Sequence, residues 1–337
     1  MAQFSLVEIS PPLLLAVPNV SEGRDLQVIA AIGAAFADLG GASERRLADR
    51  ETRRPSGSGV RVLDVHSDED HDRSVFTLAG RQGELADALL AGAAVAVERI
   101  DATGDPSGGE SARGQHPHVG ALDVAPVVYL DASARGAACA EALLMADRIG
   151  VELGVPVFLY GELTGDRGVT RAELRRGGTA GLAARIAGGN RSRSGQRPDF
   201  GPSRMHSTAG ATLIAARPPL VAFNLQLGPP ATVKDAHAIA ALIREGGGDG
   251  LPGVRAIGVE LGGGVAQVSM NVERPLEIPL ALVIETVARH ARVASAELVG
   301  LAPRAALEGF PRELPLPGFD AARQVIENAV AENALGS

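Results

Sequence analysis

The chain has 337 residues, of which 45% are hydrophobic and 21% are charged, and its formal net charge at pH 7 is −8. This composition is too apolar for a disordered chain, and the length accommodates about two domains of roughly 100–200 residues each. With eight Phe, two Tyr and no Trp, the chain offers few rings for stacking on bases, and its negative charge repels phosphate backbones. We therefore expect no nucleic-acid partner.

Cysteine usage and the N-terminal pattern bear on the cellular compartment. A single cysteine, Cys139, excludes an intramolecular disulfide framework and any zinc site built from several cysteines. The apolar run Pro11–Val17 is short, opens on two prolines and lacks a basic leader, so it reads neither as a signal peptide nor as a membrane span. We expect a cytoplasmic protein without a membrane partner.

Strand and helix patterns alternate in the first half of the chain. Short β-branched or apolar runs predict strands over residues 13–17, 60–65, 75–78, 124–130 and 155–160. Apolar spacing and Ala-rich segments predict helices around residues 28–39, 85–100 and 133–153. The first half therefore mixes hairpins with helical crossovers.

A Gly/Ser/Arg stretch at residues 188–195 has the composition of a flexible linker. Beyond it, we expect strands over 211–216, 220–227, 254–260, 265–271 and 296–300, and helices over 231–245 and 277–293. A last helix over 321–334 has Asp320 in position to cap its start. This order is typical of an α+β sheet with helices on one face.

The expected fold is therefore α/β (α+β), with two subdomains that are each a mixed β-sheet with helices packed mainly on one face. The N-terminal subdomain is expected over residues 12–188, the C-terminal subdomain over 197–318 and a helical tail over 319–337. Because clefts between domains commonly bind ligands, we expect a ligand cleft between the two subdomains.

The first of three polar stretches, His66–Arg73, lies between two expected strands. His66, Asp68, Asp70 and His71 carry imidazole and carboxylate groups of the kind that bind borderline divalent metal ions. A solvated acidic turn or a polar substrate-binding loop explains the same residues, and all three interpretations stay open.

The second polar stretch, Arg113–Val124, contains two histidines on either side of Pro117. The proline disfavours the α conformation at His116, which is therefore expected to be extended at the end of a loop that leads into a strand. Because imidazole exchanges protons near neutral pH, His116 is a candidate general acid/base, and an ordinary surface histidine is the alternative.

The third polar stretch, Pro198–Thr212, is rich in Gly, Ser and Thr, which supply backbone donors and hydroxyl groups. Its Arg204 is able to pair with a carboxylate. An interdomain loop explains the same composition.

Read in order, these stretches and their neighbours resemble the glutamate formimidoyltransferase (formiminotransferase) family, from about residue 13 to residue 310. Each motif is modest alone, but the series is specific to the family. The matching segments are Val17-Pro18-Asn19-Val20-Ser21-Glu22-Gly23-Arg24, Leu63-Asp64-Val65, Arg73-Ser74-Val75-Phe76-Thr77, Gly114-Gln115-His116-Pro117, Gly120-Ala121-Leu122-Asp123-Val124, Val155–Glu162, Pro198-Asp199-Phe200-Gly201-Pro202, Gly210-Ala211-Thr212, Ala222-Phe223-Asn224, Ala266–Ser269 and Leu298–Leu301.

The resemblance implies transfer of a formimidoyl group from N-formimidoyl-L-glutamate to N5 of tetrahydrofolate, in histidine degradation and one-carbon metabolism. It also implies a homodimer, with tetrahydrofolate held between the subdomains as acceptor substrate and with no metal. The histidine of the family's Gly-x-His-Pro motif matches His116. The family's folate-contacting stretch matches Gly201, Pro202, Ser203, Arg204, Met205, His206, Ser207, Thr208, Ala209 and Gly210.

In that reaction an amine attacks the amidine carbon, and the adduct collapses once the glutamate nitrogen is protonated, which is the step expected of His116. Asp64 and Asp123 are the candidate carboxylates that orient this histidine or stabilise the developing cation. Both substrates carry carboxylates, and the candidates to bind them are Arg24, Arg73, Arg113 and Arg204.

The chain departs from the family pattern at several points. His118 stands where Arg is frequent, residues 104–111 lengthen the loop before His116, and Ala209 stands where family members can have Trp. The rings nearest to the matched motifs, and so the candidates to stack on a pterin, are Tyr160, Phe200 and Phe223.

Three other functions stay open on the sequence. One is a related folate-dependent transferase or cycloligase that uses another one-carbon donor. Another is a metal-dependent hydrolase that uses His66, Asp68, Asp70 and His71. The last is a catalytically silent folate-binding or interaction protein.

Overall fold

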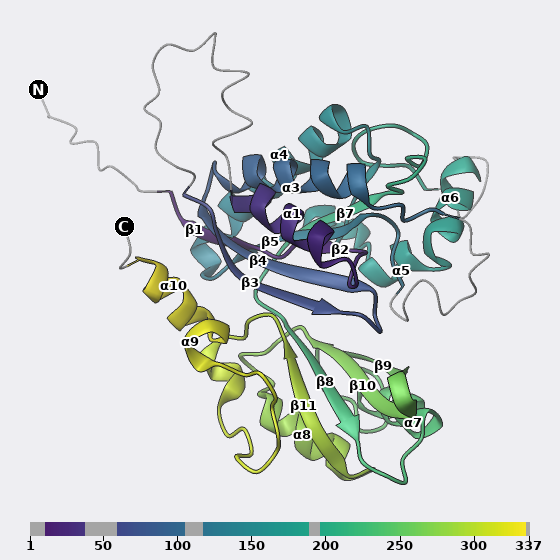
Figure 1. Ribbon diagram of the computed structural model, residues 1–337, viewed down its shortest axis with the longest axis vertical. Coiled ribbons are helices and arrows are strands. Elements are labelled where there is room, and N and C mark those ends of the chain that lie inside the picture. The colour runs from purple at the N-terminus through teal and green to yellow at the C-terminus, as the bar shows by residue number, and fades with distance from the viewer. Residues whose placement is uncertain (1–10, 38–58, 105–116, 189–195, 335–337) are drawn as a thin grey trace, which may run out of the picture.

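The computed structural model describes residues 11–37, 59–104, 117–188 and 196–334. Two β-sheets lie face to face, each with helices on its outer side, so that the layers run helix, sheet, sheet, helix (Figure 1). The predicted α+β architecture with two sheets is confirmed. None of the helices in the described segments is long and apolar enough to cross a membrane.

The first sheet has seven strands and mixes both directions. Its strands are β1 (Leu13–Ala16), β2 (Asn19–Val20), β3 (Arg61–Asp68), β4 (Arg73–Arg81), β5 (Leu122–Tyr129), β6 (Val157–Leu159) and β7 (Thr212–Arg217). The order is β1-β4-β2-β5-β7-β6, with β3 paired to the outside of β4. Strands β5, β7 and β6 run parallel to one another and the other pairs are antiparallel.

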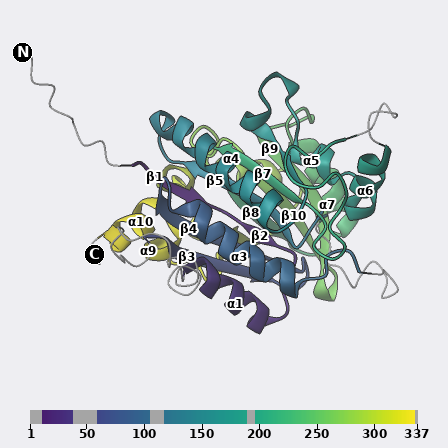
Figure 2. The same ribbon diagram turned by 90° about the horizontal axis from the view of Figure 1, so that it is seen from above.

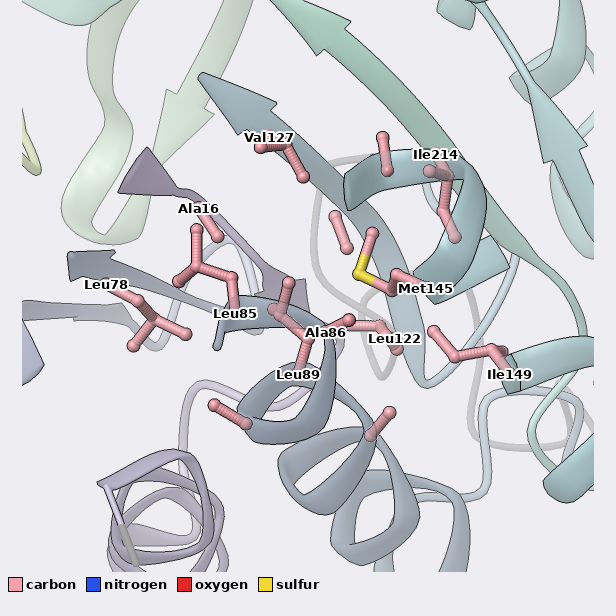
Figure 3. Close-up of a cluster of buried hydrophobic side chains, with 14 of the residues drawn as sticks. Ala16, Leu78, Leu85, Ala86, Leu89, Leu122, Val127, Met145, Ile149 and Ile214 are labelled. Atoms are coloured by element: carbon pink, nitrogen blue, oxygen red, sulfur yellow. The ribbon is translucent and has the colours of Figure 1, made fainter. Parts of the chain in front are cut away.

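Helices α1 (Leu26–Ala37), α3 (Leu85–Arg99) and α4 (Arg135–Glu152) cover the outer face of this sheet (Figure 2). Their apolar faces meet the sheet in one buried cluster, in which Leu85, Leu89 and Met145 pack beside Leu122 and Ile214 (Figure 3). Each such side chain contributes about 1.5–3 kcal/mol by leaving water.

The carboxylate of Glu141 fastens two of these helices together. Glu141 lies in α4 and is 2% exposed, and its oxygens accept hydrogen bonds from the amides of Gly83 and Ala86, both at 2.8 Å. Those amides are at the start of α3, where the first helical N–H groups have no partner within the helix. A side chain of α4 therefore caps α3.

The inner face of the first sheet is covered at one end by α5 (Arg171–Arg175) and α6 (Gly178–Gly188). These two helices are absent from the sequence predictions. α5 has only five residues, too few for a helical period, and Gly178, Gly181 and Gly188 weaken the helical pattern of α6. Short 3₁₀ helices lie at η4 (Ala132–Ala134), η5 (Gly161–Arg167), η7 (Gly262–Gly264) and η8 (Arg304–Leu307).

The second sheet is antiparallel. Its strands β8 (Val221–Leu227), β9 (Val254–Leu261), β10 (Val265–Val272) and β11 (Val293–Val299) have the order β11-β8-β10-β9. Helices α7 (Val233–Ile243) and α8 (Leu280–Ala288) cover its outer face, and together with the sheet they bury the second core.

The C-terminal tail forms α9 (Ala321–Gln324) and α10 (Ile326–Ala334), and the predicted cap is confirmed, because Asp320 accepts from the amide of Ala322 at 2.9 Å. Backbone hydrogen bonds between Ala302 and both Gln324 and Ile326 tie the tail to the second subdomain. On its other side the tail packs against the first sheet, where Ile326 and Ala329 join a buried cluster with Leu15, Leu63 and Val128. The tail therefore spans both subdomains.

One strand lies in a different sheet from the one predicted. We expected residues 211–216 in the second subdomain, but β7 hydrogen-bonds to β5 and β6 in the first sheet. The chain passes from one sheet to the other through Pro218-Pro219-Leu220. The Gly/Ser/Arg composition of 188–195 predicts irregular chain, and irregular chain need not coincide with a domain boundary.

Candidate functional site

A cavity lies between the inner faces of the two sheets. Its empty volume is about 1060 Å³, part of it open to solvent. Clefts between domains are common places for small-molecule ligands.

Strand alternation explains what each sheet contributes to this cavity. In β5, Ala125 and Val127 point into the helix-covered core, so Val124 and Pro126 point into the cavity. With Val17 of the β1–β2 corner and Val75 of β4 they make the floor of the cavity apolar.

The second sheet presents polar side chains to the same space. In β8 and β10 the apolar residues fill the second core, which leaves Asn224, Ser269 and Asn271 on the cavity side. The cavity is thus apolar on one wall and rich in amide and hydroxyl groups on the other.

Three arginines, Arg73, Arg171 and Arg217, line the cavity. Burial, reinforced by the charges of Arg175 and Arg171, lowers the pKa of Arg73 to about 9, and burial lowers the pKa of Arg217 to about 10. Burial and the charge of Arg175 also lower the pKa of Arg171. All three guanidinium groups remain protonated at neutral pH.

A buried ion pair lies next to these arginines. Asp123 is 2% exposed, accepts from the amide of Val119 at 2.9 Å and pairs with the guanidinium of Arg175. Asp123 also borders a small second pocket with His71, Arg73 and His118. The carboxylate therefore anchors the chain that leads into β5.

His66 joins the two subdomains across one side of the cavity. Its Nε2 lies 3.2 Å from a carboxylate oxygen of Glu297 in β11, and the other oxygen of Glu297 accepts from the Asn224 amide at 2.8 Å. Burial opposes protonation of His66, but the hydrogen bond and charge of Glu297, with the charges of Asp64 and Asp68, raise its pKa above 6.5. The hydrogen bond from His66 lowers the pKa of Glu297.

Asp64 lies two residues before His66 on β3 and is half-buried. Burial raises the pKa of its carboxyl group, against the charges of His66 and Arg323. Its Oδ2 is buried without a hydrogen-bond partner, and Asp64 is not among the residues that line the cavity.

His66 and Asp68 lie at the end of β3, and the rest of the His-Asp run, residues 69–72, forms the turn that leads into β4. Asp68 accepts from the amide of His71 at 2.8 Å, and Asp72 accepts from the amide of Gly23 at 3.0 Å. Asp70 reaches the second subdomain and accepts from the amide of Gly262 at 3.2 Å. Within the described ranges, no three His, Cys, Asp or Glu side chains form a group that could hold a metal ion.

His116 lies outside the described residues, as does Arg113. The chain on both sides of that segment contacts the predicted folate stretch, residues 201–210. Ala102 donates to the carbonyl of Thr208 at 2.9 Å, and Gly120 forms a β-bridge with Gly210.

Residues 201–210 themselves do not line the cavity. They wrap the end of the first sheet, where Gly201 meets Gly150 of α4 and the Nδ1 atom of His206 accepts from the amide of Ala209 at 3.0 Å. Among the predicted carboxylate-binding arginines, Arg73 lines the cavity, whereas Arg24 and Arg204 are exposed elsewhere.

None of the three predicted stacking rings lines the cavity. Phe223 is fully buried in the second core, with its ring 6.4 Å from that of Phe310. Tyr160 is buried under α5 and α6, and Phe200 packs against the first core. A ligand in the cavity meets aliphatic walls, amides and arginines instead.

Sequence reasoning missed Arg171, Arg217 and Glu297. Arg171 follows Thr170, and the capping box between Thr170 and Glu173 is the local signal that marks the start of α5. Glu297 has no such signal, because its partner His66 is far away in the sequence.

Comparison with known proteins finds relatives along most of the chain. Residues 13–217 match the family model of the formiminotransferase domain, N-terminal subdomain. The chain is 33% identical over 320 residues to a glutamate formimidoyltransferase of Streptococcus pyogenes serotype M1, covering 93% of this chain and 96% of that protein. It is 32% identical over 315 residues to a glutamate formimidoyltransferase of Thermoplasma acidophilum, covering 91% and 94%.

A longer protein also matches. The chain is 35% identical over 312 residues to a formimidoyltransferase-cyclodeaminase of Sus scrofa, covering 88% of this chain and 51% of that protein. The family model spans more than half of the chain, and two relatives match over nearly their whole length. The chain belongs to the formiminotransferase family.

Proposed function

We propose that this chain is a glutamate formimidoyltransferase, which moves the formimidoyl group of N-formimidoyl-L-glutamate to N5 of tetrahydrofolate. The relatives that match along nearly their whole length carry this activity in their names. The observation that carries the proposal is the cavity between the sheets, which pairs an aliphatic wall with amides and three arginines. A flat, partly apolar ring system and carboxylates are the ligand chemistry that such walls accept.

The proposed reaction is an amine exchange at an amidine carbon. N5 of tetrahydrofolate attacks that carbon and loses its proton, and a tetrahedral adduct forms. The bond from carbon to the glutamate nitrogen then breaks as that nitrogen takes up a proton. His116 accepts the first proton and donates the second, a role that contributes about 10²–10⁴-fold to rates in general acid–base catalysis.

Two carboxylates are proposed to support His116. Asp123 accepts from the amide of Val119, three residues after His116, and so fixes where the strand begins. Asp64 is proposed to act indirectly, because its negative charge stabilises the protonated form of its neighbour His66 and helps to raise the pKa of that histidine. We propose that residues 201–210 contact folate from the end of the first sheet, outside the lining of the main cavity, where they lie beside Ala102 and Gly120.

Incubation of the protein with tetrahydrofolate and N-formimidoyl-L-glutamate tests the proposal, with formation of 5-formimidoyltetrahydrofolate as the readout. Absence of product from a folded sample at high enzyme concentration would refute it. His116→Ala is expected to abolish turnover and to retain binding of tetrahydrofolate.

The matched control is His290→Ala, since His290 pairs with Asp249 at 2.8 Å on the outer side of the second subdomain. That variant is expected to keep wild-type turnover. Wild-type rates in His116→Ala would remove His116 from the mechanism.

The assembly and compartment are proposals too. We propose a homodimer in the cytoplasm, with the two small-molecule substrates as its ligands. Sedimentation analysis tests the assembly, and a monomer that turns over at the full rate would contradict it.

A further inference from the structure

The arginines beside the cavity differ in how their charge is balanced. Arg175 has the buried carboxylate of Asp123 as its partner. Arg171 has neither a hydrogen bond nor an ion pair with any described residue, and Arg217 donates only to the carbonyl of Pro218, at 3.0 Å. The Nε atom of Arg217 is buried without a partner.

The carboxylates near these two cations are already engaged. Asp123 is held by Arg175, and Glu273, whose charge reaches both Arg171 and Arg217, lies 3.4 Å from Arg255. Because buried charges in proteins are normally paired, two neighbouring guanidinium groups that face a cavity without a carboxylate partner are arranged for an anion that arrives with the ligand.

Neighbouring groups indicate which end of the cavity this is. Arg73 lies within electrostatic range of Arg171 and lines both the main cavity and the small second pocket. His118 also lines that second pocket, and it is two residues after His116. Arg171, with Arg217 beside it, is therefore at the end of the main cavity that borders the second pocket, and that pocket is lined by His118, two positions after the proposed acid/base in the sequence.

The chemistry of the two substrates then selects between their carboxylates. In N-formimidoyl-L-glutamate, the nitrogen that leaves is attached to the carbon that bears the α-carboxylate. In tetrahydrofolate, the whole aminobenzoyl group separates N5 from the glutamyl carboxylates. Carboxylate contacts near the reacting atoms therefore belong to the donor.

We propose that Arg171 and Arg217 form the subsite that binds the two carboxylates of the formimidoyl donor's glutamate. The proposal rests on the proposed function for the identity of the donor. Each guanidinium presents a planar fork of N–H groups that matches a carboxylate in a bidentate manner. Two such groups explain a preference for a dicarboxylic donor.

Two measurements test the subsite, and one of them needs no turnover. Calorimetric titration with glutarate, a dicarboxylate without a transferable group, is expected to show binding to the wild-type protein. Butyrate, which has a single carboxylate, is expected to show no binding. Arg171→Gln and Arg217→Gln are each expected to raise the dissociation constant for glutarate about 10- to 100-fold. In steady-state kinetics the same variants are expected to raise KM for the donor by a similar factor and to leave KM for tetrahydrofolate unchanged.

Arg171→Lys keeps the positive charge but loses the planar fork of N–H groups. Its affinity for glutarate and its KM for the donor are expected to lie between those of the wild type and of Arg171→Gln. Arg289→Gln is the matched control, because Arg289 pairs with Glu285 at 2.8 Å on the surface of α8. Circular dichroism confirms that each variant is folded.

The outcomes separate this inference from the function on which it rests. Glutarate binding that both variants lose, in a protein without transfer activity, would support the subsite and refute the proposed function. Transfer activity in which the variants raise KM for tetrahydrofolate alone would assign the arginines to folate and overturn the inference. Variants that change neither glutarate binding nor either KM would overturn it as well.

Discussion

The contact between His66 and Glu297 gives the sharpest prediction about how the two subdomains are held together. Their atoms are 3.2 Å apart, and the side chains are 22% and 28% exposed. Exposed ion pairs contribute about 0.2–1 kcal/mol, whereas losing one partner of a fully buried pair costs about 3–5 kcal/mol. Since the exposure of this pair lies between that of a surface pair and that of a fully buried pair, we expect a coupling free energy of about 1–2 kcal/mol.

The coupling has a defined pH dependence. The pKa of His66 is raised above 6.5, so its contribution is complete below that pH and is lost as the pH rises through the folded-state pKa. The pKa of Glu297 is lowered below 4.5, so its contribution is complete above that pH and is lost as the pH falls through the folded-state pKa. The full coupling is therefore expected between pH 4.5 and pH 6.5.

A double-mutant cycle measures this coupling. The variants are His66→Gln, Glu297→Gln and the combination of both, unfolded in urea at about pH 5.5 and at about pH 9. Far-ultraviolet circular dichroism is the suitable signal, because the chain has no Trp. A coupling at the higher pH equal to that at the lower, or a coupling near zero at both, would refute an ionic contact between the subdomains.

Two further predictions concern the first subdomain. Gly120→Ala would place a Cβ 2.0 Å from the carbonyl oxygen of Ala211, and we expect it to lower the free energy of unfolding by about 3 kcal/mol, measured by thermal unfolding. The control is Gly136→Ala in α4, where a Cβ meets open space; it should raise the free energy of unfolding by about 0.5–1 kcal/mol. A stable Gly120→Ala would contradict the close approach of these backbones. Glu141→Ala leaves the amides of Gly83 and Ala86 without their acceptor, and it should lower the free energy of unfolding in urea by about 2–4 kcal/mol. A change below about 1 kcal/mol would show that α3 does not need this cap.

The sequence pattern predicts most of the elements, because each strand and long helix buries one face and so has a period. The same alternation also holds information that motif matching misses. In β8, Val221, Phe223 and Leu225 are the apolar set, which places Phe223 in the core and Asn224 at the cavity. A motif alone makes Phe223 a stacking candidate, and the period of the strand corrects it.

Contacts between segments far apart in the chain have no such signature. The pairing of His66 with Glu297 depends on how the two sheets stack. The approach of Arg171 to Arg217 depends on how α5 packs against β7 within the first subdomain. The sheet to which β7 belongs is likewise decided by its hydrogen bonds to β5 and β6, while its own apolar pattern suits either sheet.

The tail that crosses both subdomains has a consequence for synthesis. Residues 13–217 contain every strand of the first sheet, so this sheet is able to form while the ribosome is still making the second. Until residues 326–329 emerge, however, Leu15, Leu63 and Val128 lack the side chains that cover them, and the cavity lacks the wall made by Ile326. A nascent or shortened chain therefore exposes an apolar patch, and exposed apolar surface of this kind promotes aggregation.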